Sequence, residues 1–363
     1  MISSQCSPVS VSSVSMMLHD AYKTIDINNL WGEGDEGDEL SSDDGCSVSP
    51  PPSPTDSIDS TSSSSSTKTF LSIDRLSCKC STLIELSNFV SSSTGSFFKE
   101  YRSQRPVLLT DYANQWSVMK HANLYQLIKD LYIQEHSSNT VSVLRAFDKI
   151  HFFGNGLCYS DEMKIEDVLS DRVMEGEHND PFYCRLRPIP KSFSNIFHLD
   201  FDESNKNVLF KRKLSACWIG TKGSITPLHF DTCHGFLAVV KGIKRVTLFP
   251  AEDSMYLYRD TRSSSVNPNS SKCDYEIWRD DILNGGNPRF PPTPLDGVDV
   301  TFKDMYSKME EASPREVYVH GGQMLYIPPG CWHTVENVTL TVSVLLPCDM
   351  TGEEDLHPAL HLF

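Results

Sequence analysis

The hydrophobic and polar positions between residues 105 and 147 predict two strands with a helix between them. Apolar or alternating runs at Arg105–Leu109 and Val141–Phe147 are typical of short strands. Between them, apolar side chains recur at spacings of three and four residues, which place them on one face of a helix: Leu124, Leu127, Ile128 and Leu131. We interpret both kinds of element as scaffold.

A second short helix is expected after residue 160. Ser160 is a favoured N-cap residue. The apolar positions that follow it have helical spacing: Met163, Ile165, Val168 and Leu169. This helix is also interpreted as scaffold.

After Leu214 the pattern changes to short β-rich runs separated by Gly, Pro and Asp. These runs are Ala216–Ile219, Phe236–Val240, Arg245–Phe249, Arg315–Val319, Met324–Ile327 and Leu340–Leu346. Such a series predicts a mainly β fold with flanking helices, in the form of a sandwich or jelly-roll barrel. A long insertion, at about residues 260–314, contains a helix-compatible part at Thr301–Glu311. It either contributes to function at one end of the barrel or is a disordered surface loop.

Composition divides the chain into four parts. Residues 1–68 are acidic and Ser-rich, with almost no aromatic residues, and are expected to be disordered. Residues 69–214 are expected to form a helix-and-strand part that packs on the barrel. Residues 215–347 form the barrel with its insertion, and residues 348–363 form a C-terminal tail.

Charge and cysteine content narrow the functional classes. The formal net charge is −16, which repels a nucleic-acid backbone, although a local basic patch stays possible. The 11 cysteines show no disulfide framework, so reduced thiols are expected. Neither a membrane span nor a secretory signal is evident, which favours the cytoplasm, the nucleus or both and gives no reason to expect a membrane partner.

The candidate chemistry begins with His229 and Asp231. They stand two residues apart, so on an extended strand both side chains point to the same face and can hold one metal ion. A His-x-Asp pair is common by chance. His333, which follows a β-run and a Pro-Pro-Gly turn, offers a third ligand. Two imidazoles and one carboxylate are the ligand set of non-haem Fe(II) oxygenases, whereas a structural zinc ion prefers a closed set with thiolates.

An oxygenase of this kind also needs a cation for the far carboxylate of a keto acid. Lys244 opens a predicted strand and is a candidate, with a solvent-exposed turn lysine as the alternative. Thr226, three residues before His229, could add a hydroxyl to the same carboxylate.

Several motifs together resemble the JmjC hydroxylases of the cupin-8 type over roughly residues 95–347. They are Trp218-Ile219-Gly220, Thr226–Asp231, Lys241–Arg245 with Leu248-Phe249-Pro250, Gly321-Gly322-Gln323, Ile327-Pro328 with Trp332-His333, and upstream Arg105–Leu108 with Trp116. The resemblance implies a double-stranded β-helix that uses Fe(II), 2-oxoglutarate and O₂. It implies that His229, Asp231 and His333 are the catalytic iron ligands.

The resemblance also implies a cosubstrate site. Lys244 and Thr226 would bind the 2-oxoglutarate carboxylate, and Tyr183 would reach the same cosubstrate, unless it is a core aromatic. Ser343 or Leu345 falls where relatives carry a Ser or Asn near the cosubstrate.

Two positions depart from the family pattern. Gly235 stands where many relatives have an Asn, and Val239 where a Gln is common. His234 could replace part of the lost contact or be an ordinary loop histidine. These changes leave the metal ligands whole and concern the cosubstrate geometry.

The resemblance favours a dioxygenase that hydroxylates a protein side chain. The chain has no Cys/His clusters of the kind found in chromatin-reader domains. The alternatives are a catalytically weak JmjC interaction module, a tRNA- or RNA-modifying hydroxylase, and a lysine demethylase. The substrate and the oligomeric state are not predicted.

Overall fold

The computed structural model describes residues 101–136, 138–153, 158–170, 173, 180–186, 193, 216–261, 267–283, 302–350 and 354–360. The expectation of a disordered segment at residues 1–68, and of order beginning near residue 70, lies outside the described residues.

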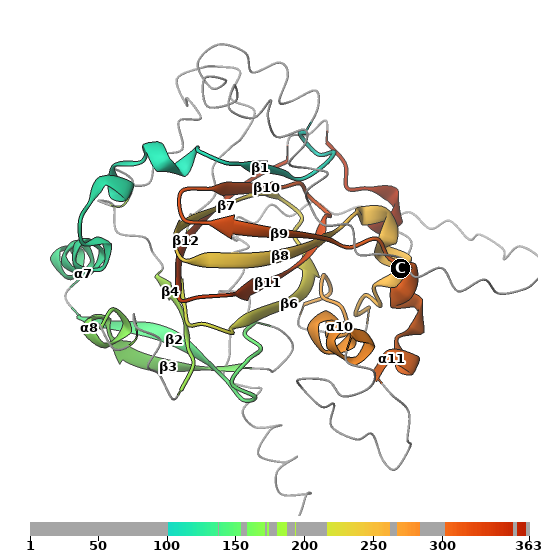
Figure 1. Ribbon diagram of the computed structural model, residues 1–363, viewed down its shortest axis with the longest axis horizontal. Helices are drawn as coiled ribbons and strands as arrows, with labels where there is room; N and C mark the ends of the chain where they lie inside the picture. The colour runs from blue at the N-terminus through green and yellow to red at the C-terminus, as the bar shows by residue number, and fades with distance from the viewer. Residues whose placement is uncertain are drawn as a thin grey trace, which may run out of the picture. The chain divides into compact units, whose positions relative to one another are not determined.

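The described part consists mainly of two antiparallel sheets (Figure 1), which confirms the expected jelly-roll fold. The eight-stranded sheet has the order β1-β10-β7-β12-β5-β4-β2-β3. Its strands are β1 (Val107–Leu109), β2 (Thr140–Ala146), β3 (Cys158–Lys164), β4 (Tyr183–Leu186), β5 (Ala216–Gly220), β7 (His234–Lys241), β10 (Met324–Ile327) and β12 (Thr341–Cys348). The four-stranded sheet, in the order β6-β11-β8-β9, contains β6 (Ile225–Phe230), β8 (Ile243–Phe249), β9 (Arg315–His320) and β11 (Trp332–Asn337).

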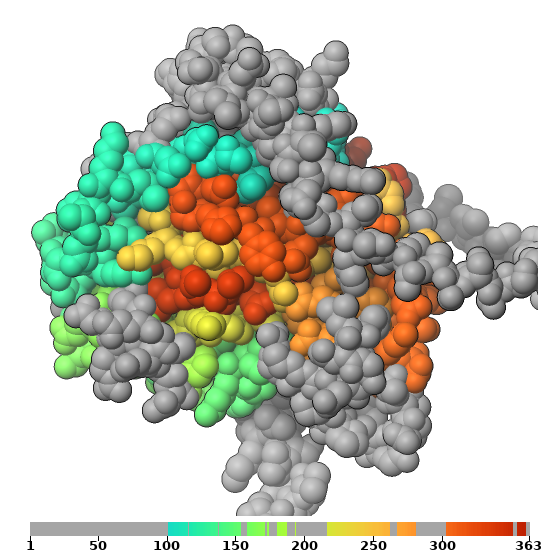
Figure 2. All heavy atoms as spheres, in the orientation of Figure 1, coloured from blue at the N-terminus to red at the C-terminus, as the bar shows by residue number. Residues whose placement is uncertain are grey.

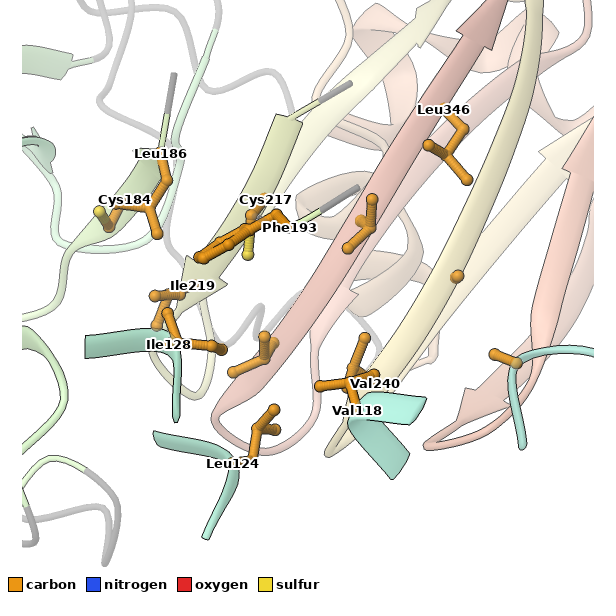
Figure 3. Packing of buried hydrophobic residues seen from close by; sticks show 14 of the residues in the cluster. Val118, Leu124, Ile128, Cys184, Leu186, Phe193, Cys217, Ile219, Val240 and Leu346 are labelled. Carbon is orange, nitrogen blue, oxygen red and sulfur yellow. The ribbon is translucent and has the colours of Figure 1, made fainter. Parts of the chain in front are cut away.

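The outer face of the eight-stranded sheet is covered by helical segments. These are α7 (Leu124–Glu135), α8 (Ile165–Val168), η1 (Ala113–Gln115) and η2 (Ser117–Lys120). Helix α7 begins where the side chain of Asn123 accepts a hydrogen bond from the Gln126 backbone, and it buries Ile128 completely. Figure 3 shows Leu124 and Ile128 beside sheet residues that include Ile219 and Val240. This packing confirms the predicted helix and its apolar face.

A separate apolar cluster joins the inner faces of the two sheets. Alternate residues of β7 and β10, such as Leu237 and Leu325, meet residues of β8 and β11, such as Val246 and Val335. Because side chains alternate along a strand, the polar residues that share this parity also face the interior of the barrel. The candidate site described below is built from such polar residues.

The insertion covers part of the outer face of the four-stranded sheet. It contributes α10 (Tyr275–Leu283), α11 (Phe302–Met305) and η5 (Ser307–Glu311), while η4 (Ala251–Tyr256) lies just before it and η6 (Pro358–Leu360) follows β12. Trp278 of α10 packs in one cluster with Phe230 and Trp332 from the sheet. Figures 1 and 2 show the orange insertion beside the strands of this sheet.

A charged network fastens α10 to the same outer face. Arg245 of β8 donates hydrogen bonds to Glu336 of β11 and, over 2.7 Å, to Glu276 of α10. Arg279 lies 2.7 Å from Glu276 as well. Burial raises the pKa of Glu276 to about 7, and the two guanidinium groups oppose that rise. The insertion is therefore tied to the sheet by paired charges in addition to apolar packing.

The helix expected to begin at Ser160 is wrong over most of its length. Residues 158–164 form strand β3, which pairs with β2 along its whole length, and only Ile165–Val168 is helical. The hydroxyls of Ser142 and Ser160 lie 2.9 Å apart across the two strands. Backbone pairing with a neighbouring strand outweighs the weak helical preference of this polar segment.

Strand β4 and helix α10 were not predicted. The helix-compatible part at Thr301–Glu311 is confirmed by α11 and η5. None of the described helices is long and apolar enough to cross a membrane. The seven cysteines that the structure describes form no disulfide with one another.

Candidate metal and cosubstrate site

The structure brings His229, Asp231 and His333 together at one end of the barrel. His229 on β6 and His333 on β11 are direct cross-strand partners, and Asp231 follows the end of β6. One potential ligand atom from each residue lies within 4.8 Å of the others. Both imidazoles are buried, with their ring centroids 4.2 Å apart. Three residues far apart in sequence thus present a compact set of metal ligands.

Backbone carbonyls orient both imidazoles. Nδ1 of His229 lies 2.8 Å from the carbonyl oxygen of Pro227, and Nδ1 of His333 lies 3.0 Å from that of Cys331. Because a carbonyl only accepts, each Nδ1 carries a proton and each Nε2 carries the lone pair that a metal needs. Burial and the neighbouring His229 also lower the pKa of His333, which keeps its ring neutral.

A tight turn carries His333 into position beside Asp231. The backbone N–H of Gly330 donates to the carbonyl of Asp231 over 2.8 Å, and that of Cys331 donates to Pro328 over 3.2 Å. Gly330 has a φ of 76°, and a Cβ there would lie 2.3 Å from Leu360. The Pro-Pro-Gly turn therefore links two of the three candidate ligands through the backbone.

Lys244 lies inside the barrel and is only 1 % exposed. Its ammonium donates to the phenol oxygen of Tyr183 over 2.8 Å and to Oδ1 of Asn337 over 2.7 Å. Within the described residues it forms no ion pair. Burial lowers the pKa of Lys244 to about 7. The exposed turn lysine considered from the sequence is therefore wrong, and the barrel holds a buried cation next to neutral oxygen atoms.

Tyr183 and Thr226 lie at the same place. Tyr183 on β4 is buried, and burial raises the pKa of its phenol, while hydrogen bonds with Asn337 and Thr226 oppose that rise. The Tyr183 ring is part of a buried aromatic cluster, and its oxygen accepts a hydrogen bond from Lys244.

Asn337 is the site residue that the sequence did not reveal. It is fully buried, faces Lys244 across β11 and β8, and accepts a second hydrogen bond from Thr341 over 3.0 Å. A Cβ on Gly220 would lie 2.1 Å from the side-chain nitrogen of Asn337. Glycine at position 220 therefore makes the room that Asn337 needs.

Ser343 lies on the interior face of β12 and is fully buried. Its hydroxyl has no hydrogen-bond partner within the described part of the chain. The cross-strand neighbours of Ser343 are Val239 and Trp218, whose side chains offer no acceptor. A buried unsatisfied hydroxyl is unusual and fits a position that a polar ligand completes. Leu345, the alternative, is on the same face two residues further along β12.

The structure also shows where the positions that depart from the family pattern lie. Gly235 and Val239 are both on β7, and Val239 belongs to the interior cluster. His234 is the first residue of β7 and is fully buried, so it is not a loop histidine. It has the parity of Phe236, away from the interior, and its Nδ1 lies 2.9 Å from the hydroxyl of Tyr326. His234 therefore does not replace a cosubstrate contact.

This arrangement fits Fe(II) and a dicarboxylate. Two imidazoles with defined tautomers and one carboxylate suit a metal that keeps open positions for other ligands. A buried ammonium without an ion-pair partner among the described residues suits a carboxylate.

Comparison with known proteins gives one family and several relatives. A family model described as "Cupin-like domain" matches residues 94–347. Lysine-specific demethylase JMJ30 of Arabidopsis thaliana is 33% identical over 129 residues, which cover 35% of this chain and 24% of that protein. JmjC domain-containing protein D of Dictyostelium discoideum is 31% identical over 164 residues, which cover 45% and 29%.

HSPB1-associated protein 1 of Bos taurus is 30% identical over 155 residues, which cover 42% of this chain and 26% of that protein. The matched part thus spans less than a third of the length of each of these relatives.

Proposed function

Because the chain belongs to the cupin-like, or JmjC, family, we propose that it is an Fe(II)- and 2-oxoglutarate-dependent oxygenase that hydroxylates a protein side chain. The observation that carries the proposal is the buried ammonium of Lys244, which lies in the same barrel as the metal ligands. A charge that is desolvated and lacks an ion-pair partner among the described residues is unfavourable unless a ligand supplies the opposite charge.

His229, Asp231 and His333 would hold the iron. Lys244 would bind the distal carboxylate of 2-oxoglutarate, with Tyr183 and Thr226 as further hydrogen-bonding groups. When bound, Fe(II) and 2-oxoglutarate supply the oxidising power, since O₂ and the keto acid yield succinate, CO₂ and one oxygen atom for a substrate C–H bond.

The residues of the chain would mainly bind, orient and exclude water. Asn337 would hold the Lys244 ammonium in place, since its Oδ1 accepts a hydrogen bond from one of the three ammonium N–H groups over 2.7 Å. The buried hydroxyl of Ser343 would donate a hydrogen bond to the cosubstrate. The apolar side chains of Val239 and Val335 would keep bulk water from the interior.

Lysine demethylation is the second candidate, since two of the similar proteins are named lysine-specific demethylases. Both reactions begin with oxidation of a C–H bond, and they differ in the group that carries it. Gly235 and Val239 motivate a third candidate, in which the fold is a catalytically weak interaction module.

The experiment measures succinate formed by the full chain with Fe(II), ascorbate and 2-oxoglutarate, with and without a protein extract. We expect succinate above the level of the His333→Ala and Lys244→Met variants. Mass spectrometry should find a protein that gains one oxygen atom. Loss of a methyl group from lysine would favour the demethylase. Tight metal-dependent binding of 2-oxoglutarate without turnover of any candidate would contradict the hydroxylase.

A further inference from the structure

The side chain of Arg259 joins three segments of the chain on the outer face of the four-stranded sheet. It donates hydrogen bonds to the backbone carbonyl of Leu360 over 2.6 Å and to that of Pro268 over 2.8 Å. Its guanidinium carbon lies 5.1 Å from the centre of the Phe230 ring. Arg259 thus ties helix η6 and the insertion to strand β6.

Phe230 and Trp332 connect these segments to the metal ligands. Phe230 stands between the first two ligands in the sequence, and Trp332 directly precedes the third. The two rings lie 4.7 Å apart between centroids, and Leu360 packs with them in one buried cluster. Because neighbouring side chains of a strand point to opposite faces, these rings lie outside while the ligands point inward. A displacement of either ring would therefore move the backbone that carries the ligands.

Leu360 also packs against the Pro-Pro-Gly turn. A Cβ on Gly330 would lie 2.3 Å from the Leu360 side chain, so the two residues are in close contact. The backbone N–H of Gly330 donates to the carbonyl of Asp231 over 2.8 Å. The two prolines of the turn help to line a cavity of about 550 Å³. Since the turn is not packed on all sides, its position depends on contacts such as the one with Leu360.

We propose that Arg259 and Leu360 are positioning residues that hold the metal ligands in the geometry that Fe(II) requires. This inference rests on the proposed function and deepens it. Neither side chain is a metal ligand, and both act through Phe230, Trp332 and the turn. A metal site needs its ligands held to within roughly 0.5 Å, and loss of an outer contact typically weakens metal binding roughly 10- to 100-fold.

This support comes in part from outside the matched domain. Leu360 follows the residues 94–347 that match the family model. It is only 3 % exposed, although it lies close to the C-terminal end of the described residues. The burial of a leucine beside two ligand-bearing strands indicates that this segment is part of the structure around the metal site.

The charge of Arg259 separates positioning from electrostatics. Arg259 donates to the neutral carbonyl oxygens of Leu360 and Pro268, which do not cancel its positive charge. A positive charge repels a metal cation, so its removal alone would strengthen metal binding. A positioning role predicts the opposite result, which is weaker metal binding.

The test measures the affinity of the full chain for Mn(II) by calorimetry, without 2-oxoglutarate. We expect Arg259→Met and Leu360→Ala each to weaken binding about tenfold. Leu360→Met conserves the volume of the side chain and should bind Mn(II) like the wild type. The visible absorption bands of the Co(II)-loaded protein report the ligand geometry, and they should shift only in the two variants that weaken Mn(II) binding.

Arg145→Met is the matched control for Arg259→Met. Arg145 on β2 also donates to a backbone carbonyl, that of Asp180 over 2.8 Å, and its guanidinium carbon lies 5.8 Å from the centre of the Phe182 ring. This control removes the same charge and similar contacts away from the metal ligands. It should leave Mn(II) affinity unchanged. Unchanged or tighter Mn(II) binding by Arg259→Met would overturn the proposal.

Leu124→Ala is the matched control for Leu360→Ala, since Leu124 is buried on α7 at the outer face of the other sheet. Both truncations should lower the melting temperature, and only Leu360→Ala should weaken Mn(II) binding. An equal loss of affinity in both would show a general effect of destabilisation and overturn the proposal. If a variant shows no cooperative melting transition, Arg259→Lys or Leu360→Val takes its place and is judged by the same criteria.

Mn(II) binding by the wild type separates the two levels of inference. If the wild type does not bind Mn(II), the proposed function fails and this inference fails with it. If the wild type binds Mn(II) and the variants match it, only this inference fails. If the variants weaken binding as expected while the wild type forms no succinate, the proposed function fails and the positioning role stands.

Discussion

The ammonium of Lys244 lies 2.7 Å from the side-chain oxygen of Asn337, its direct partner across strands β8 and β11. The pair joins a cation to a neutral acceptor in a place where water is excluded. The neutral amide orients the ammonium without neutralising its charge, and this supports the proposed carboxylate ligand.

Replacing Asn337 by Asp should convert this arrangement into an ion pair. The new carboxylate would neutralise Lys244 and repel the distal carboxylate of 2-oxoglutarate. We expect the affinity for N-oxalylglycine in the presence of Mn(II), measured by calorimetry, to fall at least about tenfold. Metal affinity should be unchanged. An undiminished affinity for N-oxalylglycine would show that its carboxylate is not bound at Lys244.

Replacing Lys244 by Met should abolish N-oxalylglycine binding and change the dependence of stability on pH. Burial lowers the pKa of Lys244 from 10.5 to about 7, so between these values the unfolded chain binds more protons than the folded chain. The free energy of unfolding of the wild type should therefore rise with pH in this window, relative to the variant. The slope is at most about 1.4 kcal/mol per pH unit.

Below pH 7 Lys244 is protonated in both the folded and the unfolded chain, so the buried charge destabilises the folded chain to its full extent. In that range the Lys244→Met variant should be more stable than the ligand-free wild type. Urea unfolding from pH 6 to pH 10 measures both effects. A constant difference in stability across that range would contradict a depressed pKa.

Replacing Gly220 by Ala should disturb the site directly. The added Cβ would lie 2.1 Å from Asn337 and 3.0 Å from the ring of Tyr183. We expect a loss of about 1–3 kcal/mol of stability and weakened N-oxalylglycine binding. Gly235→Ala is the control, since its nearest atoms lie 3.8 Å from the added Cβ. Equal effects at positions 220 and 235 would contradict this account.

Replacing His333 by Ala should remove metal binding. The loss of one of three ligands leaves a site too weak to retain Fe(II), so metal-dependent succinate formation should disappear. The matched control is His357→Ala, a half-exposed histidine that lies 3.3 Å from Glu252. Metal analysis after dialysis measures the effect, and retention of stoichiometric metal by His333→Ala would exclude it as a ligand.

Local patterns in the sequence, together with the family resemblance, singled out His229, Asp231, His333 and Lys244 as candidates, and the structure brings the first three together. A strand repeats every two residues, so the spacing of His229 and Asp231 alone puts them on one face. The jelly-roll fold followed from the series of short β-runs. The spacing of His229 and Asp231 and the β-runs depend on neighbouring residues and can be recognised without a structure, whereas the assignment of His333 needed the combined motifs of the family resemblance.

Asn337 could not be predicted in the same way. Its relation to Lys244 depends on the register between β8 and β11, which are separated along the chain by the insertion. The residues next to it in the sequence, Val338 and Thr339, give no sign of a partner on β8. The wrong helix prediction at residues 158–164 has the same origin. Strand β3 pairs with β2, and the sequence of the segment itself does not indicate this partner.

Strands β8 and β11 present different residues on their two faces. Lys244 and Asn337 face the interior of the barrel, whereas Arg245 and Glu336 lie on the outer face under the insertion. Adjacent residues of one strand therefore have different partners, because inward residues contact the candidate site and outward residues contact the insertion. We therefore expect that an exchange of the insertion would require changes only at the outward positions, because the inward positions have their own partners. Chimeras that keep the interior of the barrel and carry a different insertion on the outer face of the four-stranded sheet would test this separation of the two faces.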